Sequence, residues 1–200
     1  NVNLNRATGG NKDYTAAMTV MQSALQLISL PLNGLGTGMQ PFVSFNYGRG
    51  NSKRLKEGIR IVTLIAFIFA VTIWSFSLAA PQVYAILFSA SASVTEIVKS
   101  NAPLFLMGSV MFFVQMTLQN VNIALGQARR ALILAVMRKV VILIPLCFIL
   151  THFLGYKGVY MSEGIADFVA GIIPAAVIFS SLPKIFSERE KLVKAQGGQL

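Results

Sequence analysis

Charged residues are scarce in this sequence, and acidic residues are the scarcest of them. Only 12% of the 200 residues are charged and seven are acidic, against a hydrophobic fraction of 54%, whereas a soluble domain typically carries about 25% charged residues. A soluble chain of this length leaves much of its surface in water and needs polar side chains to cover it. The composition therefore argues against a soluble domain. A lipid bilayer, which acts as an apolar solvent, removes the conflict.

Cysteine and histidine are nearly absent, with one residue of each type. Cys147 lies inside an apolar run, so it has no partner for an internal disulfide or for a metal site. The sequence contains no glycine-rich phosphate loop, and its acidic residues have no nearby nucleophile or metal-binding cluster. We therefore expect neither an enzyme nor a resident cofactor or metal.

Five apolar runs follow one another along the chain. Each is long enough to cross a bilayer core, which takes about 20 residues of helix, and strand-like alternation is weak throughout. The sequence thus predicts an all-α, polytopic membrane helix bundle of about five transmembrane helices plus the end of another. It divides into a transmembrane lobe over 1–182 and a cytoplasmic tail over 183–200. The predicted spans are 14–45, 59–80, 102–126, 131–153 and 158–182.

The net charge of +10 does not indicate a nucleic-acid partner, because of where the charges lie. Basic residues form short clusters between apolar runs and do not line one face of a polar domain. The segments after the first and third runs, together with the C-terminal segment, carry most of them. Basic residues concentrate on the cytoplasmic side of membrane spans. The distribution predicts a multi-pass protein of the cell membrane with a cytoplasmic C-terminus.

The first and third runs each carry a stripe of uncharged polar residues. At about 100° per residue, these side chains fall along one side of each helix. Such a stripe either lines a water-filled path or hydrogen-bonds a neighbouring helix, and the sequence leaves both readings open. The candidate cavity-lining residues are Gln22, Gln26, Asn33 and Gln40 in the first run and Gln115, Gln119 and Asn122 in the third.

Two acidic residues lie in the last apolar run. Asp167 follows the start of that run by about nine residues, so at about 1.5 Å per residue it lies near the bilayer middle. Glu163, one turn earlier, shares its face. A carboxylate at this depth usually faces a cavity or a partner, and one that changes protonation can couple movement of a solute to protons or cations. Asp167 and Glu163 are therefore candidate coupling residues. The alternatives are a structural bond to a neighbouring helix and, for Glu163, contact with the outer interface.

Several short motifs follow one another in the order found in the second half of multidrug and toxic-compound extrusion (MATE) transporters. Gly38-Met39-Gln40-Pro41, followed by Asn46-Tyr47-Gly48, resembles the end of the eighth helix of that family and the loop after it. The other matching patches are Asn1-x-x-Leu4 with Gly9-Gly10, Gly126-Gln127, Ile144-Pro145-Leu146, Gly155-x-x-Gly158 and Ile165-Ala166-Asp167. The resemblance to the C-terminal lobe covers essentially the whole chain.

This resemblance implies one of two six-helix lobes, with the chain supplying helices eight to twelve and the end of the seventh. It also implies export of cationic or amphipathic organic compounds by alternating access, in exchange for H⁺ or Na⁺. The implied partners are the N-terminal lobe of the same transporter, small organic substrates and the lipid bilayer. The alternative function is a flippase for lipid-linked sugars of the same two-lobe plan. A flippase would line its cavity with basic residues to hold a pyrophosphate, and no basic residue lies deep in a predicted span.

Overall fold

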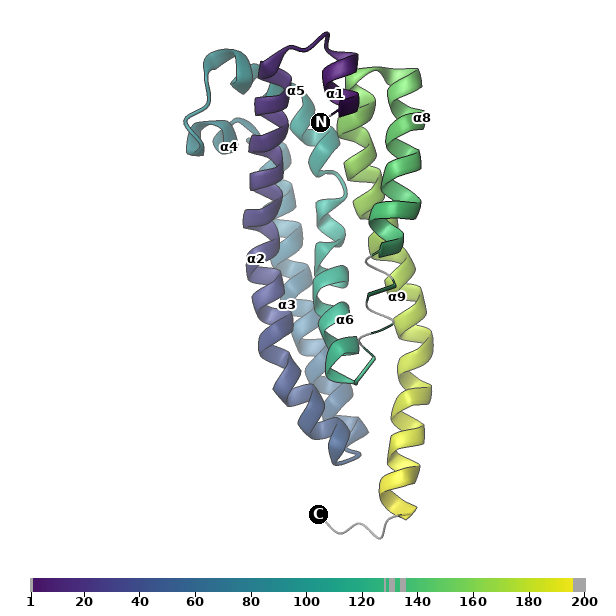
Figure 1. Ribbon diagram of the computed structural model, residues 1–200. Helices are drawn as coiled ribbons and strands as arrows, with labels where there is room; N and C mark the ends of the chain where they lie inside the picture. The colour runs from purple at the N-terminus through teal and green to yellow at the C-terminus, as the bar shows by residue number, and fades with distance from the viewer. Residues whose placement is uncertain (1, 128, 130–131, 134–135, 196–200) are drawn as a thin grey trace.

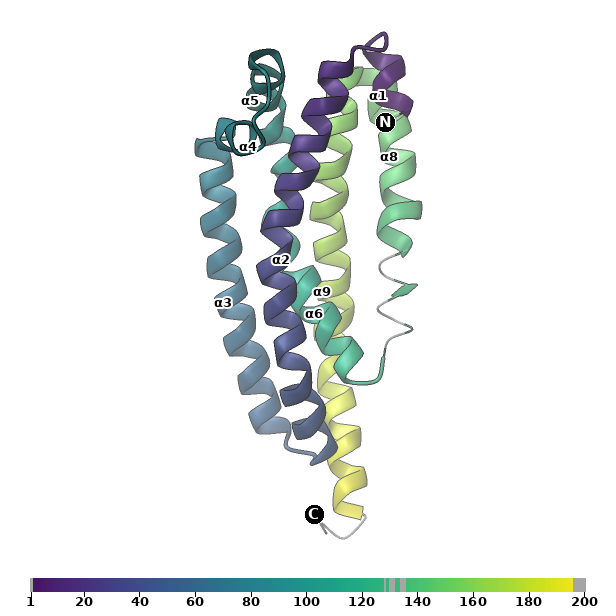
Figure 2. The same ribbon diagram turned by 60° about the vertical axis from the view of Figure 1, so that its left-hand side comes forward.

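Long helices stand side by side in the computed structural model, which describes residues 2–127, 129, 132–133 and 136–195 (Figures 1 and 2). Helices joined by short turns account for nearly all of these residues, and no strand occurs among them. The all-α fold expected from the sequence is therefore confirmed. The elements are α1 (Val2–Ala7), α2 (Lys12–Gly48), α3 (Ser52–Ala79), α4 (Gln82–Leu87), α5 (Ala92–Leu106), η1 (Ser109–Met111), α6 (Phe112–Ala124), η2 (Met137–Leu143), α8 (Ile144–Leu154) and α9 (Tyr156–Ala195).

Three of the long helices begin directly after a polar residue that caps them. Asn11 precedes α2, Asn51 precedes α3 and Ser91 precedes α5. Each side chain accepts a hydrogen bond from a backbone N–H of the first turn, at 2.9, 3.2 and 3.4 Å respectively. The first N–H groups of a helix have no partner inside the helix, so a side-chain acceptor at this position favours helix initiation there.

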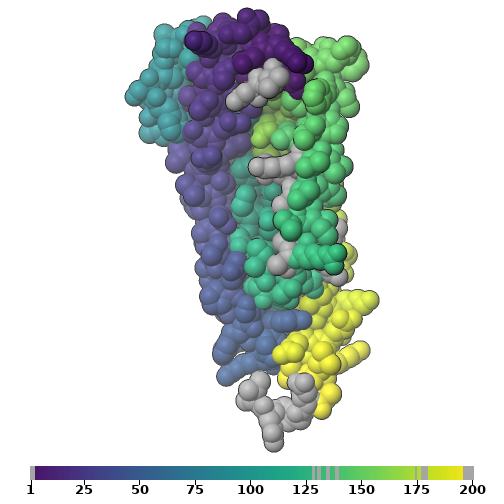
Figure 3. Space-filling view, viewed as in Figure 1, coloured from purple at the N-terminus to yellow at the C-terminus, as the bar shows by residue number. Residues whose placement is uncertain are grey.

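The bundle is organised around α6. This helix packs against α2, α3 and α9, while α9 also packs against α5 and α8. Apolar side chains fill the spaces between the helices in two clusters. Phe105 and Tyr160 belong to the first, and Val43, Leu118 and Phe186 belong to the second. From the side seen in Figure 3, α2 and the teal segment around α4 lie along one edge of the molecule, and α8 with the end of α9 lies along the other.

The outer face of α3 is apolar. Ile61, Leu64, Ile65 and Ile68 are all exposed, and only 17% of the most apolar 18-residue stretch of this helix is buried. Within the described residues, α3 is the one continuous helix that is long and apolar enough to cross a membrane by length and composition. The bent pair Ala92–Leu106 and Ser109–Ala124 adds a second if it counts as one span. Exposed apolar area is unfavourable in water at about 25 cal/mol per Å², so this face is suited to contact with lipid.

The third apolar run differs from the single span expected at 102–126. Its helix begins earlier, at Ala92, and breaks between α5 and η1, where the two parts are bent by 47°. Pro103 lies in α5 and lacks the N–H that an unbroken helix would use. Gly108, at the break, has no side chain to hold α9 away. The local sequence weakens the helix here, and contact with α9 favours the bent form.

The fourth run, expected at 131–153, also differs from one regular helix. Residues 131, 134 and 135 lie outside the described part of the chain. The remainder begins as the π-helical segment η2 and continues as α8. Pro145 stands in the first turn of α8, where it supplies no N–H to the turn before it. π-Helical turns arise where the regular hydrogen-bond ladder is disturbed in this way.

The charged segment expected to be a tail over 183–200 is helical through Ala195, as a direct continuation of α9. Leu182 and Phe186 are buried against the bundle. The Nε and Nη2 atoms of Arg189 donate to the carbonyl oxygens of Tyr47 and Gly48 at 3.2 and 3.0 Å. Leu182 and Phe186, which are one helical turn apart, pack this part of α9 against α2 and α3. Residues 196–200 lie outside the described part of the chain.

The turn between α2 and α3 and the C-terminal part of α9 lie at one end of the molecule, whereas α1 and α4 lie at the other (Figure 1). The first of these ends carries Arg49, Lys53, Lys56 and Arg189, so the fold gathers basic segments that are distant in sequence. This end is defined here as the basic end. Its location in the cytoplasm stays a prediction from the charge distribution.

Candidate functional site

Asp167 lies at the contact between α9 and the break in the α5–α6 helix. Its side chain is almost completely buried, at 1% exposure. A Cβ atom built on Gly108 would lie 2.6 Å from the Cβ of Asp167 and would collide with the carbonyl oxygen of Gly164. A Cβ on Gly164 would in turn collide with the carbonyl oxygen of Leu104. The two backbones therefore touch, and the carboxylate of Asp167 projects from the helix at this contact.

The helix break beside Asp167 has hydrogen bonds of its own. The Oγ of Ser109, itself buried, donates to the carbonyl oxygen of Leu106 at 2.7 Å. The N–H of Met111 donates to the carbonyl oxygen of Gly108 at 3.0 Å. These bonds restore part of the ladder that an unbroken helix would make. Irregular backbone inside a membrane bundle is tolerated where it is buried in protein, and such breaks commonly form ion or substrate sites.

A buried carboxylate beside a helix break can hold a proton or a small cation. Its ionised form is costly in an apolar surrounding unless a cation or hydrogen-bond donors offset the charge. Glu163, the second acid of the pair expected from the sequence, is half-buried four residues earlier on α9. No group of three or more histidine, cysteine, aspartate or glutamate side chains suited to a metal ion occurs among the described residues. The arrangement is one carboxylate at the break with a second acid one turn away.

The polar stripe of α2 lies largely on an open face of this chain. Gln22, Gln26 and Asn33 are exposed, while Gln40 is half-buried. The Nε2 of Gln40 donates to the Oδ1 of Asn120 in α6 at 2.7 Å. Asn33 also contacts Asn120, by accepting from its Nδ2 at 3.3 Å. Two residues of the stripe thus make interhelical hydrogen bonds, whereas Gln22 and Gln26 face the open side of the chain.

The polar stripe of α6 lies mainly inside the bundle. Gln115 and Asn122 are buried, with exposures of 7% and 3%, and Gln119 is half-buried. The two stripes therefore do not line one common open surface of this chain. Whether they contribute to a cavity in a larger assembly stays a prediction.

Asn120 is the polar residue that joins the two helices, and the sequence reasoning missed it. Its Nδ2 donates to the carbonyl oxygen of Met116 at 2.7 Å and to the Oδ1 of Asn33 at 3.3 Å. Gly36 of α2 leaves room for this side chain, because a Cβ there would lie 2.6 Å from Nδ2. Asn120 lies about 100° around the helix from Gln119, and so outside the stripe. The feature of the sequence that could have indicated this contact is Gly36, a small residue in the helix that faces Asn120.

The glycines of α2 also open a groove between α2 and α3, with a volume of about 1060 Å³. Pro31, Gly34, Gly38 and Phe42 line its α2 side. A Cβ on Gly34 or Gly38 would meet no atom within 4 Å. Small residues at these positions therefore leave space that larger side chains would fill.

Together, the long helices, the exposed apolar face of α3 and the buried acid at a helix break define a polytopic membrane helix bundle. Comparison with known proteins agrees, since the MatE family model matches residues 9–149. The chain belongs to the MatE family, and it is an integral membrane protein.

Two curated relatives are both described as the multidrug export protein MepA. The protein of Staphylococcus haemolyticus is 30% identical over 200 residues, which are 98% of this chain and 42% of the relative. The protein of Staphylococcus saprophyticus is 26% identical over 174 residues, which are 85% of this chain and 37% of the relative. The chain thus spans about two fifths of the length of these relatives, close to one lobe of a two-lobe protein.

Solved structures show the same fold. A MATE transporter in the bent conformation superposes with a TM-score of 0.84 at 20% identity, covering 94% of this chain and 42% of that one. An outward-facing multidrug resistance MATE transporter of the MOP superfamily gives 0.81 at 23% identity, covering 92% and 42%. A eukaryotic MATE transporter, AtDTX14, gives 0.80 at 18% identity, covering 91% and 41%. The described bundle therefore has the architecture of one lobe.

Proposed function

We propose that this chain forms the C-terminal lobe of a two-lobe secondary transporter, which exports cationic or amphipathic organic compounds in exchange for H⁺ or Na⁺. The observation that carries the proposal is Asp167, a carboxylate 1% exposed, packed against a helix break. Secondary transporters bind ions and substrates near such breaks, and they alternate access by moving one part of the bundle against another.

Asp167 is the coupling residue in this proposal. A buried carboxylate is favourable with a proton or cation bound, and its ionised form is costly unless a cation or hydrogen-bond donors offset the charge. Because the break leaves the α5–α6 helix discontinuous beside it, a change in the bend would alter the access of Asp167 to water. Binding of the ion at Asp167 and the conformation of the lobe would then depend on each other. Glu163, one turn away, is the second candidate for the path of the ion.

The partner in this proposal is the N-terminal lobe of the same transporter. The exposed amides Gln22 and Gln26 of α2, and Asn33 farther along it, would line the space between the lobes. Uncharged polar groups accept a wide range of cationic and amphipathic solutes without favouring anions. A pyrophosphate-binding flippase is less well supported, because neither stripe carries a basic residue. The names of the two MepA relatives support multidrug export.

The test is export by the transporter that carries Asp167→Asn in this chain together with its N-terminal lobe. Asparagine keeps the size and polarity of the side chain but does not titrate. Efflux of a fluorescent cationic dye, normalised to protein abundance in the membrane, is expected to fall about tenfold or more, comparable with the effect of removing a positioned proton-transfer group.

The matched control is Asp13→Asn, which removes an acid from the first turn of α2 and is expected to leave efflux unchanged. Wild-type efflux by Asp167→Asn at wild-type abundance would end the coupling role of Asp167. Loss of the protein from the membrane in Asp167→Asn would instead indicate a structural role.

A further inference from the structure

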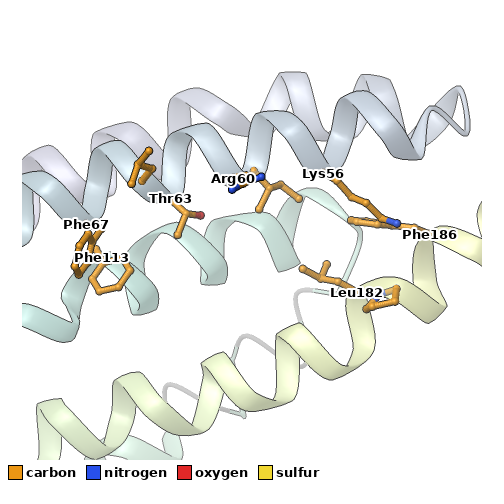
Figure 4. A pocket seen from close by; sticks show the side chains of 10 residues that line it. Lys56, Arg60, Thr63, Phe67, Phe113, Leu182 and Phe186 are labelled. Carbon is orange, nitrogen blue, oxygen red and sulfur yellow. The ribbon is translucent and has the colours of Figure 1, made fainter.

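A groove lies between α3, α6 and the C-terminal part of α9, near the basic end of the molecule (Figure 4). Its volume is about 510 Å³. Lys56, Arg60, Thr63 and Phe67 line it from α3, Phe113 lines it from α6, and Phe186 lines it from α9. The groove opens beside the apolar outer face of α3, where Leu64 and Phe67 are exposed. It is therefore accessible from the surface that faces lipid.

The lining changes from charged to apolar along α3. Lys56 and Arg60 are four residues apart, so they lie on the same face of the helix. Thr63 follows about one turn later and Phe67 one turn after that. At about 1.5 Å per residue, the distance along the helix from Lys56 to Phe67 is about 16 Å. Phe67 and Phe113 form the apolar part, with ring centroids 5.2 Å apart. This order matches a phospholipid, whose charged headgroup, ester linkages and acyl chains succeed one another over similar distances.

The hydroxyl of Thr63 points to a ligand at the middle level of the groove. Its Oγ1 is buried and has no hydrogen-bond partner among the described residues. Two other hydroxyls of the same helix behave differently, since Thr72 donates to the carbonyl oxygen four residues earlier at 2.8 Å and Ser77 does so at 2.7 Å. A buried hydroxyl without a partner is unfavourable. Thr63 lines the groove, so rotation of its side chain about χ1 would turn Oγ1 into the groove, where an ester oxygen of a bound lipid would accept its hydrogen bond.

The charges around the groove favour an anion. Its lining contains the two cations and, among the described residues, no acid. Glu190, an acid of α9, accepts a hydrogen bond from Ser52 at 3.3 Å and forms an ion pair with Lys194 at 3.1 Å. The hydrogen bond from Lys194 is the main cause that holds the pKa of Glu190 below its usual value. Lys56 also lowers the pKa of Glu190, but its contribution is the smallest of the causes. Glu190 is therefore engaged mainly by Lys194, and the two cations of the groove can face a phosphate.

We propose that this groove is a binding site for an anionic glycerophospholipid. The phosphate lies against Lys56 and Arg60, an ester oxygen accepts from Thr63, and an acyl chain lies along Phe67 and Phe113. Basic pockets between membrane helices recognise anionic headgroups in this way. Since the groove is bounded by α3 and α9, the lipid joins the end of α9 to the rest of the lobe. The inference does not depend on which solute the protein moves.

The test is lipid retention by the protein purified from membranes in detergent, measured by native mass spectrometry. The probes are phosphatidylglycerol and phosphatidylethanolamine with identical acyl chains. We expect the wild type to retain phosphatidylglycerol preferentially, and Lys56→Gln/Arg60→Gln to reduce this retention about tenfold, because each basic residue attracts the anionic headgroup. Arg49→Gln/Lys53→Gln is the matched control, because it removes the same charge at the same end of the bundle but outside the groove. It is expected to retain phosphatidylglycerol as the wild type does.

A second variant tests the groove without changing its charge. Thr63→Val preserves the shape of the side chain and removes the hydroxyl. It is expected to reduce the thermal stabilisation conferred by phosphatidylglycerol while the melting temperature of the lipid-free protein does not fall. Equal retention of the two lipids by the wild type would overturn the proposal. Full retention of phosphatidylglycerol by Lys56→Gln/Arg60→Gln would do so as well, and full lipid stabilisation of Thr63→Val would remove the role of the ester contact.

Discussion

Glycines at two positions let α5 and α9 touch through their backbones beside the buried acid. A Cβ atom at Gly108 would collide with the carbonyl oxygen of Gly164, and one at Gly164 would collide with the carbonyl oxygen of Leu104. Helices in membranes gain stability chiefly from close packing, because lipid is as apolar as their side chains. The same two residues therefore stabilise the lobe and hold Asp167 against the helix break.

Gly108→Ala is expected to destabilise the protein by about 1–3 kcal/mol, because the added methyl group forces backbone shifts in a packed contact. Gly38→Ala is the matched control, since a Cβ there would meet no atom within 4 Å. It is expected to be neutral, or stabilising by up to about 1 kcal/mol through higher helix propensity. Thermal unfolding of the purified variants in detergent measures both changes. Equal stability of the two variants would contradict the close contact at Gly108.

At the scale of elements, α9 has two roles along its 40 residues. Its first half packs on α5 and presents Asp167, and its second half returns to the end of α2. The last turn of α2 contains no basic residue of its own. Arg189 of α9 supplies one, by donating to the carbonyl oxygens of Tyr47 and Gly48. A cation at a helix C-terminus satisfies the last carbonyls and is favourable for the helix dipole.

Backbone amides of residues 183–190 are expected to exchange slowly with solvent, because this part of α9 is helical and packed. Arg189→Gln removes the contact with α2 and should speed exchange there about tenfold or more, since hydrogen bonds to charged groups contribute about 1.5–3 kcal/mol. Lys191→Gln, an exposed neighbour on the same helix, is the control and should exchange as the wild type. Hydrogen–deuterium exchange followed by mass spectrometry measures this. Fast exchange over 183–190 in the wild type would contradict a packed helix.

At the scale of the whole molecule, the fold places turns at alternate ends of the bundle. The α2–α3 turn and the end of α9 are together at the basic end, and α4 with the start of α5 is at the opposite end (Figure 1). The distribution of basic residues predicts that the basic end is cytoplasmic. If so, the α2–α3 turn is on the cytoplasmic side of the membrane and the turns at the opposite end are outside.

Cysteines placed at Lys53 and Lys191 should be labelled from the cytoplasmic side, and a cysteine at Ala92 from the outside. Each is introduced singly into a Cys147→Ser background, so that the native thiol does not react. A membrane-impermeant maleimide applied to intact cells and to inverted vesicles gives the measurement. Labelling of all three positions from the same side would contradict a bundle that crosses the membrane with its turns at alternate ends.

Much of the architecture was predictable from the sequence because it depends on properties that repeat along the chain. Apolar runs about 20 residues long indicate membrane helices wherever they pack, and the ordered motifs from Gly38-Met39-Gln40-Pro41 to Ile165-Ala166-Asp167 indicate the family. The helical continuation over 183–195 was missed, because charged residues at this end of α9 resemble a solvated tail. Phe186 and Arg189 hold this segment in place through contacts with α2 and α3, and such contacts cannot be predicted from the segment's own sequence.

The class of the protein, most of its helices and the presence of an acid in an apolar helix could be predicted, since each follows from local composition and periodicity. The tertiary structure decided what each of these residues contacts. It bent the α5–α6 helix at Gly108 and set Asp167 against the bend, joined Gln40 to Asn120 across 80 residues of chain, and closed a groove beside Lys56 and Arg60. These features arise from contacts between segments distant in sequence, and close packing between helices selects them.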